Sequence, residues 1–161
     1  MITILFFVLV LHIEFTQHAS VDSLTKSKDC IYNDGRFGII NLSHVGLKQG
    51  IPAFRHIRKD DYVYSFNPCY AFSEEPTCIN VAICQTAKDE SASYILAYNS
   101  IVTWSISIDG KVTLVYATTE RQSIVNLVCS DEIDQLIINE EYERNHYNFT
   151  LTSKCACWDK C

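Results

Sequence analysis

The stretch Gln122-Ser-Ile-Val-Asn-Leu-Val-Cys129 decides how the rest of this sequence is interpreted. Branched aliphatic residues dominate it, which is typical of a β-strand, and it ends at a half-cystine. Arg121 comes directly before it, eight residues ahead of Cys129. Because a disulfide restricts where the end of a strand can lie, a side chain at a fixed distance from a half-cystine can be held at a defined place.

The segments on either side of this strand have the same β character. Short β-rich runs occur at residues 38–42, 61–66, 79–84, 94–98, 101–108, 111–116 and 147–151. Asp109-Gly110 predicts a two-residue hairpin turn between two of them. The polar residues 86–93 are expected to form a loop, and only residues 131–145 have helical character, which is weak. Roughly eight or nine short strands at regular spacing predict one all-β domain, a sandwich or a barrel.

The N-terminus and the cysteines indicate the secretory pathway. Residues 1–20 have the features of a signal peptide, with an apolar run from Ile2 to Ile13 followed by the small residues Ala19 and Ser20. The alternative is an anchor that stays in the membrane, but the run is shorter than the ~20 residues that span a bilayer. Eight cysteines, an even number, indicate disulfides formed in an oxidising compartment. We therefore expect a secreted or lumenal chain, of the endoplasmic reticulum or the Golgi–lysosome route, with no membrane span in its mature part.

The remaining bulk features restrict the partners. The net charge is −6 and no basic stripe occurs, which argues against nucleic acid and against an anionic membrane surface. Asn41 and Asn148 each begin a sequon and are predicted sites of N-glycosylation. After a polar lead at residues 21–29, the predicted domain covers residues 30–157, and residues 158–161 form a short tail.

Polar residues at fixed offsets from half-cystines suggest a binding site. They are Gln85 directly after Cys84, Arg121 eight residues before Cys129, and Tyr147 ten residues before Cys157. An acidic run, Glu140, Glu141 and Glu143, lies just upstream of the tyrosine. An amide, a guanidinium, a carboxylate and a phenol together can donate to and accept from the hydroxyls of a sugar.

Six segments in this order resemble the mannose 6-phosphate receptor homology (MRH) domain of lysosomal-enzyme sorting receptors and of lectins of the endoplasmic reticulum. They are Cys30 with residues 38–42, then residues 64–69, 78–85, 114–116, 121–129 and 147–157. The resemblance implies a flattened β-barrel or sandwich of two orthogonal antiparallel sheets stapled by disulfides. It also implies a lectin for mannose-type N-glycans that acts in glycoprotein sorting or quality control.

In that family a Gln, an Arg, a Glu and a Tyr contact the mannose ring. By position these are Gln85, Arg121, Glu140 and Tyr147, with Glu141 and Glu143 as alternatives for the Glu. The family commonly has one further disulfide, between the loop before the Arg and a position two residues before the Tyr. Both of its cysteines are absent here, and Asn145 occupies the second position.

The resemblance implies three disulfides, Cys30–Cys69, Cys78–Cys84 and Cys129–Cys157, and we pair the remaining Cys155 and Cys161 as a clasp in the tail. Spacing alone would leave the connectivity undetermined. The tail cysteines lack the paired spacing of zinc ligands, so no metal and no cofactor are expected.

Members of the family that bind phosphomannose have a long loop before the Arg. Here only residues 117–120 precede Arg121, and Glu120 would repel a phosphate. A neutral mannose is therefore the expected ligand, and no nucleophile–base pattern suggests an enzyme.

Each polar residue also has an ordinary structural explanation. Arg121 could form a surface ion pair with Glu120 or Glu143, Tyr147 could lie on the core face with Phe149 and Leu151, and Gln85 could lie in a loop. The alternative function is accordingly an MRH-like module that has lost sugar binding and acts as a protein-interaction domain or subunit.

Overall fold

The computed structural model describes residues 23–26 and 30–161, so the predicted signal peptide and most of the polar lead lie outside the described residues. The described chain is all-β, as predicted. Its strands are β1 (Ser23–Lys26), β2 (Ile31–Asp34), β3 (Gly38–Asn41), β4 (Phe54–Lys59), β5 (Tyr62–Phe66), β6 (Phe72–Glu74), β7 (Cys78–Val81), β8 (Ile83–Ala87), β9 (Ser93–Ala97), β10 (Val102–Ile106), β11 (Val112–Ala117), β12 (Gln122–Cys129), β13 (Gln135–Glu143) and β14 (His146–Ser153). Three single-turn 3₁₀ helices connect them: η1 (Leu42–His44), η2 (Asn99–Ile101) and η3 (Lys154–Ala156).

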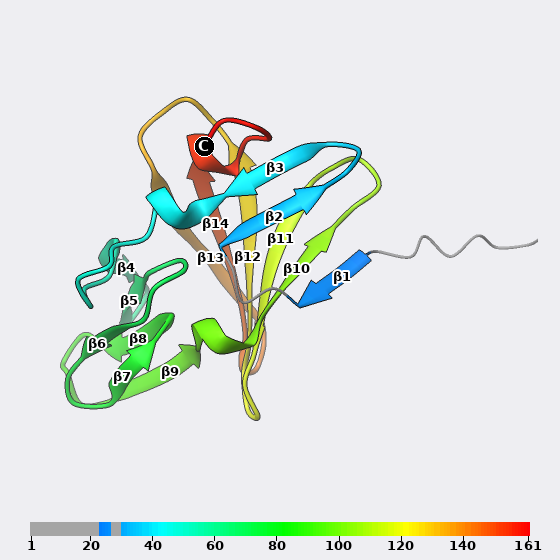
Figure 1. The fold of residues 1–161 in the computed structure, drawn as a ribbon. Coiled ribbons are helices and arrows are strands. Elements are labelled where there is room, and N and C mark those ends of the chain that lie inside the picture. Colours follow the sequence, from blue (N-terminus) through cyan, green and yellow to red (C-terminus); the bar gives the residue numbers. More distant parts are fainter. Residues whose placement is uncertain (1–22, 27–29) are drawn as a thin grey trace, which may run out of the picture.

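The larger sheet has six strands in the order β1-β10-β11-β12-β14-β13 (Figure 1). Neighbouring strands within this sheet are antiparallel except for β12 and β14, which run parallel. Their register is unbroken, with Gln122 opposite His146 at one end and Cys129 opposite Ser153 at the other. The expectation of purely antiparallel sheets is therefore wrong at this pair. The reason is the order of the strands: after β12 the chain forms the edge strand β13, which is not adjacent to β12. The chain then returns as β14, which lies between β12 and β13.

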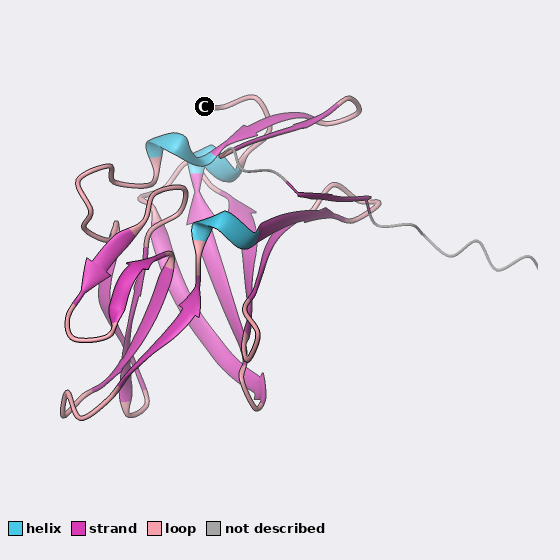
Figure 2. Cartoon of the chain, turned by 60° about the horizontal axis from the view of Figure 1, so that its bottom comes forward, coloured by secondary structure: helices cyan, strands magenta, loops and turns pink. Residues whose placement is uncertain are grey.

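The smaller sheet has the order β4-β5-β8-β9 and faces the larger one (Figure 2). Both edge strands of the small sheet contact the large one: β4 contacts its edge strand β13, and β9 contacts its inner strands β11 and β12. Two separate hairpins, β2–β3 and β6–β7, complete the fold. The result is a sandwich in which residues on the facing surfaces of β5, β8 and β14 are brought close together.

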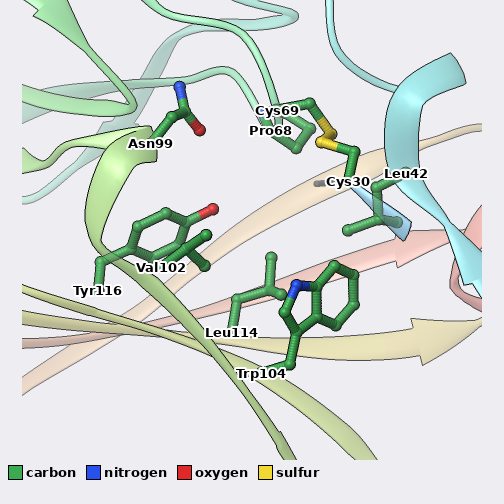
Figure 3. A pocket seen from close by; sticks show the side chains of 9 residues that line it. All are labelled: Cys30, Leu42, Pro68, Cys69, Asn99, Val102, Trp104, Leu114 and Tyr116. Carbon is green, nitrogen blue, oxygen red and sulfur yellow. A yellow bond between two sulfur atoms is a disulfide. The ribbon is translucent and has the colours of Figure 1, made fainter. Parts of the chain in front are cut away.

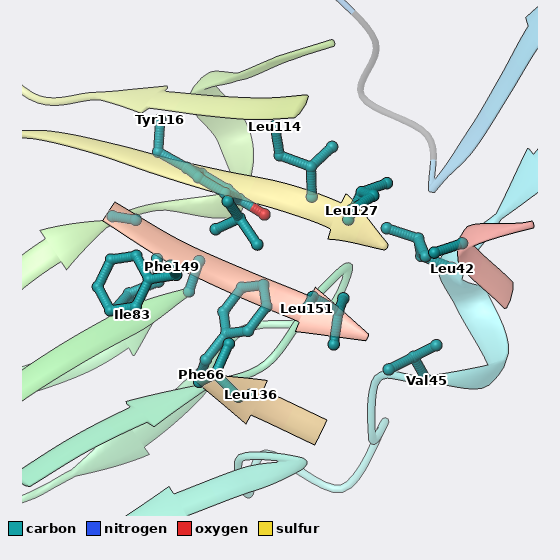
Figure 4. Packing of buried hydrophobic residues seen from close by; sticks show 14 of the residues in the cluster. Leu42, Val45, Phe66, Ile83, Leu114, Tyr116, Leu127, Leu136, Phe149 and Leu151 are labelled. Atoms are coloured by element: carbon teal, nitrogen blue, oxygen red, sulfur yellow. The ribbon is translucent and has the colours of Figure 1, made fainter. Parts of the chain in front are cut away.

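The core fills the space between the sheets (Figure 4). Strand β12 buries every second side chain from Ser123 to Leu127, and β14 does so from Tyr147 to Ser153, which matches the two-residue period of a strand. Phe149 is 1% exposed and packs edge-on against the Tyr64 ring of the opposite sheet, with ring centroids 6.0 Å apart. Such aromatic contacts supply much of the apolar area buried in a small domain.

Four disulfides staple the sandwich, and no free cysteine remains among the described residues. They join Cys30 to Cys69, Cys78 to Cys84, Cys129 to Cys157, and Cys155 to Cys161, the pairs given above from the resemblance and the tail. Cys129–Cys157 links the end of β12 to the segment that follows β14. Disulfides of this number are typical of secreted or lumenal proteins. No helix in the described part of the chain is long and apolar enough to span a membrane.

Several sequence-based expectations need correction. Residues 131–145, expected to be weakly helical, contain β13, and the polar lead contains β1. The run 79–84 is divided between β7 and β8, and β8 extends into the predicted loop as far as Ala87. The β10–β11 turn has three residues rather than two, because Ser107 N donates to Lys111 O at 3.0 Å and Gly110 takes the left-handed conformation, with φ of 80°.

The packing predicts how stability responds to truncation of the core. Phe149→Ala should lower the free energy of unfolding by about 3–5 kcal/mol, because it removes a buried ring between the sheets. Ile133→Ala is the matched control: that side chain is 92% exposed, so the change should stay within about 0.5 kcal/mol. Denaturant unfolding with the disulfides intact measures both. Equal losses for the two variants would contradict the packing described here.

Candidate functional site

The predicted site residues lie on three strands, β8, β13 and β14, and directly before a fourth, β12. Gln85 lies on β8, directly opposite Tyr64 on β5 and Tyr94 on β9. Tyr147 lies on β14, opposite Ser123 on β12 and Glu141 on β13. Strand register therefore places the amide and the phenol on the facing surfaces of the two sheets.

The Gln85 side chain connects these surfaces. It is 4% exposed, and its Nε2 donates to the hydroxyl of Tyr64 at 2.8 Å. The hydroxyl of Tyr147 donates to its Oε1 at 3.4 Å. One amide thus joins a tyrosine of the small sheet to a tyrosine of the large sheet, and Gln85 lies in a strand rather than in a loop.

Arg121 lies beside this group, just ahead of β12. Its side chain is 20% exposed, its Nη1 is 3.2 Å from Glu120 Oε2, and its guanidinium lies over the Tyr94 ring at 5.4 Å from the centroid. Its positive charge lies close enough to Tyr147 to act to lower the pKa of that phenol. Arg121 Nε is buried without a hydrogen-bond partner among the described residues. The guanidinium therefore retains an unused donor next to the tyrosine pair.

Of the three acidic residues considered, Glu141 is the one placed toward the phenols. It faces Tyr147 in the strand register, whereas Glu140 faces Asn148 and Glu143 faces His146. β-Bulges between Ile138 and Glu140, and between Glu141 and Glu143, set this arrangement. Glu141 also accepts a hydrogen bond from the backbone N–H of Asn145 at 2.6 Å.

Burial and negative charge both keep the tyrosines protonated. Burial is the main cause that raises the pKa of Tyr64 to about 12, and the charge of Glu141 adds to it. Burial likewise raises the pKa of Tyr147, again with a contribution from Glu141, while Arg121 opposes the shift. At physiological pH both hydroxyls are neutral and can donate as well as accept.

A cavity of about 110 Å³ opens beside this cluster, lined by Lys59, Asp60, Tyr62, Tyr64, Gln85, Ile138, Glu140, Glu141, Tyr147 and Asn148. About 10–15 Å³ of such space already holds one water, so the cavity has room for several waters or for a few hydroxyls of a small ligand. Three of the four predicted residues, Gln85, Glu140 and Tyr147, line it. Arg121 does not, and it reaches the cluster through Tyr147 and Tyr94.

Sequence reasoning missed three tyrosines of this region as site residues. Tyr62 and Tyr64 line the cavity, and Tyr94 contacts Tyr62 edge-on at 6.4 Å between ring centroids. The alternating Tyr62-Val-Tyr64 of a predicted strand was a usable signal, because residues two apart in a strand share a face.

Two other hollows are less suited to a polyol. One lies beneath the Cys30–Cys69 disulfide, with Trp104, Leu114 and Tyr116 on its floor (Figure 3). At about 20 Å³ it holds roughly one water and belongs to the core. The other, about 700 Å³, is a groove on the outer side of the small sheet, where Glu74 already pairs with Arg55 and His56.

Comparison with known proteins adds nothing to this description: no protein-family model matches the chain, and no curated protein matches it in sequence.

The tyrosine environment predicts a measurable titration. The difference in phenolate absorbance between the unchanged protein and Tyr64→Phe follows the ionisation of Tyr64. As the pH is raised, this difference should have its midpoint near pH 12. A raised acid pKa means that the unfolded state loses its proton first, so stability should fall as the pH rises from 10 toward 12. In denaturant the same difference should return to a midpoint near 10. A midpoint near 10 in the folded protein would show that Tyr64 is not buried as described.

Proposed function

We propose that this chain is a lectin module of the secretory pathway that binds a mannose residue of N-linked glycans. The observation that carries the proposal is the Gln85 amide held between two tyrosine hydroxyls, with Arg121 and Glu141 beside it. These groups supply donors and acceptors in one place, which is what recognition of adjacent sugar hydroxyls requires.

The cluster keeps unused hydrogen-bonding capacity. The Gln85 amide has two N–H donors and a carbonyl oxygen with two lone pairs, and its internal partners engage one donor and one lone pair. A sugar hydroxyl that enters the cavity can therefore bond to Gln85 without first breaking both of its existing bonds.

The charge around the cavity favours a neutral sugar. Asp60, Glu140 and Glu141 line it against a single cation, Lys59, and Glu120 neutralises part of Arg121. A phosphate group would face this excess of negative charge without a nest of backbone amides to hold it. We infer that the ligand is unphosphorylated mannose, bound without a cofactor and without a chemical step.

The second candidate is a module that keeps this architecture without binding sugar and serves as a protein-interaction domain or subunit. The specific observation in its favour is that Gln85 and Tyr147, 4% and 6% exposed, already bond to each other in a cavity of modest size. A high-mannose glycan array, probed with refolded protein whose disulfides are intact, separates the two candidates. Saturable binding to mannose-terminated glycans supports the lectin, and no binding supports the interaction module.

Replacement of Arg121 tests the lectin site itself. Arg121→Ala should weaken binding to immobilised mannan at least tenfold, about 1.4 kcal/mol, because Arg121 acts on Tyr147, which lines the cavity. Arg36→Ala is the matched control, since that guanidinium lies on the β2–β3 hairpin, its side chain is 62% exposed, and it should leave binding unchanged. If Arg121→Ala binds as well as the unchanged protein, the assigned site is wrong.

Competition distinguishes the two forms of mannose in the same assay. Free mannose should displace the protein from mannan at least as well as mannose 6-phosphate does. If the phosphorylated sugar were better by tenfold or more, the charge argument would be overturned while the site would stand.

A further inference from the structure

The outer face formed by β11, β12 and β14 of the six-stranded sheet is uncharged, whereas the edge strand β13 carries Glu140 and Glu143 opposite Asn148 and His146. In β11, β12 and β14, all of them described, the side chains that point away from the core are Thr, Val, Ile, Ala, Gln, Asn and one His, with no Lys, Arg, Asp or Glu. Charged residues make up 20% of the whole chain, so this face departs from its surroundings. Val128 and Ile137 are 43% and 44% exposed there. A flat β surface of this kind favours association between chains unless something covers it.

The Asn148 sequon lies toward one side of this face, on β14 between β12 and the edge strand β13. Asn148 Oδ1 accepts from Asn126 Nδ2 at 2.8 Å and from Asn139 Nδ2 at 3.0 Å, so neighbouring strands hold the oxygen from both sides. Asn148 Nδ2 donates to no described residue and is not buried. The nitrogen that would carry a glycan is therefore not fully buried and is not engaged by the described residues.

The other sequon is placed differently. Asn41 Oδ1 accepts from the backbone N–H and the hydroxyl of Ser43, and Asn41 Nδ2 donates to the carbonyl of Cys161 at 3.4 Å. Its nitrogen is thus engaged with the disulfide-bonded tail. Of the two sites, Asn148 is the one whose folded geometry already matches a glycosylated side chain.

We propose that Asn148 carries an N-glycan that lies over the outer face of the six-stranded sheet and shields it from association with other chains. In the attachment step Asn148 Nδ2 forms a bond to C1 of the first N-acetylglucosamine of a lipid-linked diphosphate oligosaccharide. The C1–O bond to the diphosphate breaks, the nitrogen loses one proton, and the lipid diphosphate leaves. Asn126 and Asn139 are positioning residues that keep the carbonyl inward. This inference does not require sugar binding at the Gln85 cluster, although Asn148 also lines the cavity there.

The first measurement is glycopeptide mass spectrometry of the full chain secreted from eukaryotic cells. The tryptic peptide of residues 145–154 contains no cysteine and isolates this sequon. It should carry N-acetylhexosamine and hexose, and Asn148→Gln should remove that mass. An unmodified peptide in the secreted protein would overturn the proposal.

The second measurement tests shielding in folded protein, so it does not depend on whether Asn148→Gln folds. In an Asn41→Gln background, an endoglycosidase trims the glycan to one N-acetylglucosamine, and light scattering follows the molecular mass. The trimmed protein should shift from monomer to larger species, with hydrogen-exchange protection gained on β12 and β14. If trimmed protein stays monomeric, or if untrimmed protein already associates through these strands, the shielding role is refuted.

Discussion

The Gln85 amide is the interaction on which the functional end of this molecule depends. A buried amide must find partners, because an unsatisfied one costs about 1–3 kcal/mol. Gln85 finds them in Tyr64 on its own sheet and Tyr147 on the other, so the two sheets can meet at this end only in an arrangement that satisfies all three groups. The same requirement that closes the sandwich gathers phenols, an amide and, through Tyr147, a guanidinium beside one cavity.

The disulfides make this arrangement possible. Cys129–Cys157 joins the end of β12 to the segment after β14, which supports the parallel pairing that brings Tyr147 and Arg121 side by side. Cys78–Cys84 fixes the turn into β8 one residue ahead of Gln85. Disulfides of this kind restrict the unfolded chain and so stabilise the folded state. Because of this stabilisation, a domain of this size can tolerate polar residues at buried positions.

Much of the fold was accessible from sequence, and the failures have identifiable causes. Strands β12 and β14 were recognisable because their side chains alternate between the core and the solvent, which leaves a two-residue period of apolar residues in the sequence. β13 was missed because it is an edge strand in which only Leu136 is buried, so it has no apolar face to recognise. β4 was missed because a bulge and the left-handed backbone of His56, with φ of 53°, interrupt its period. For the site, the offsets from cysteines correctly predicted that Gln85 and Tyr147 lie close together. Bulges in β13 determine which glutamate faces them, and no local sequence pattern predicts a bulge.

The central claim is that the Gln85–Tyr147 cluster is where a sugar binds, and nuclear magnetic resonance titration with methyl α-mannoside tests it most directly. The account predicts saturable shifts of the Gln85 side-chain amide and of the Tyr64 and Tyr147 rings, with the Asn126 amide on the outer face of the large sheet unchanged. Shifts confined to the outer groove around Glu74, or no saturable shift at all, would contradict it.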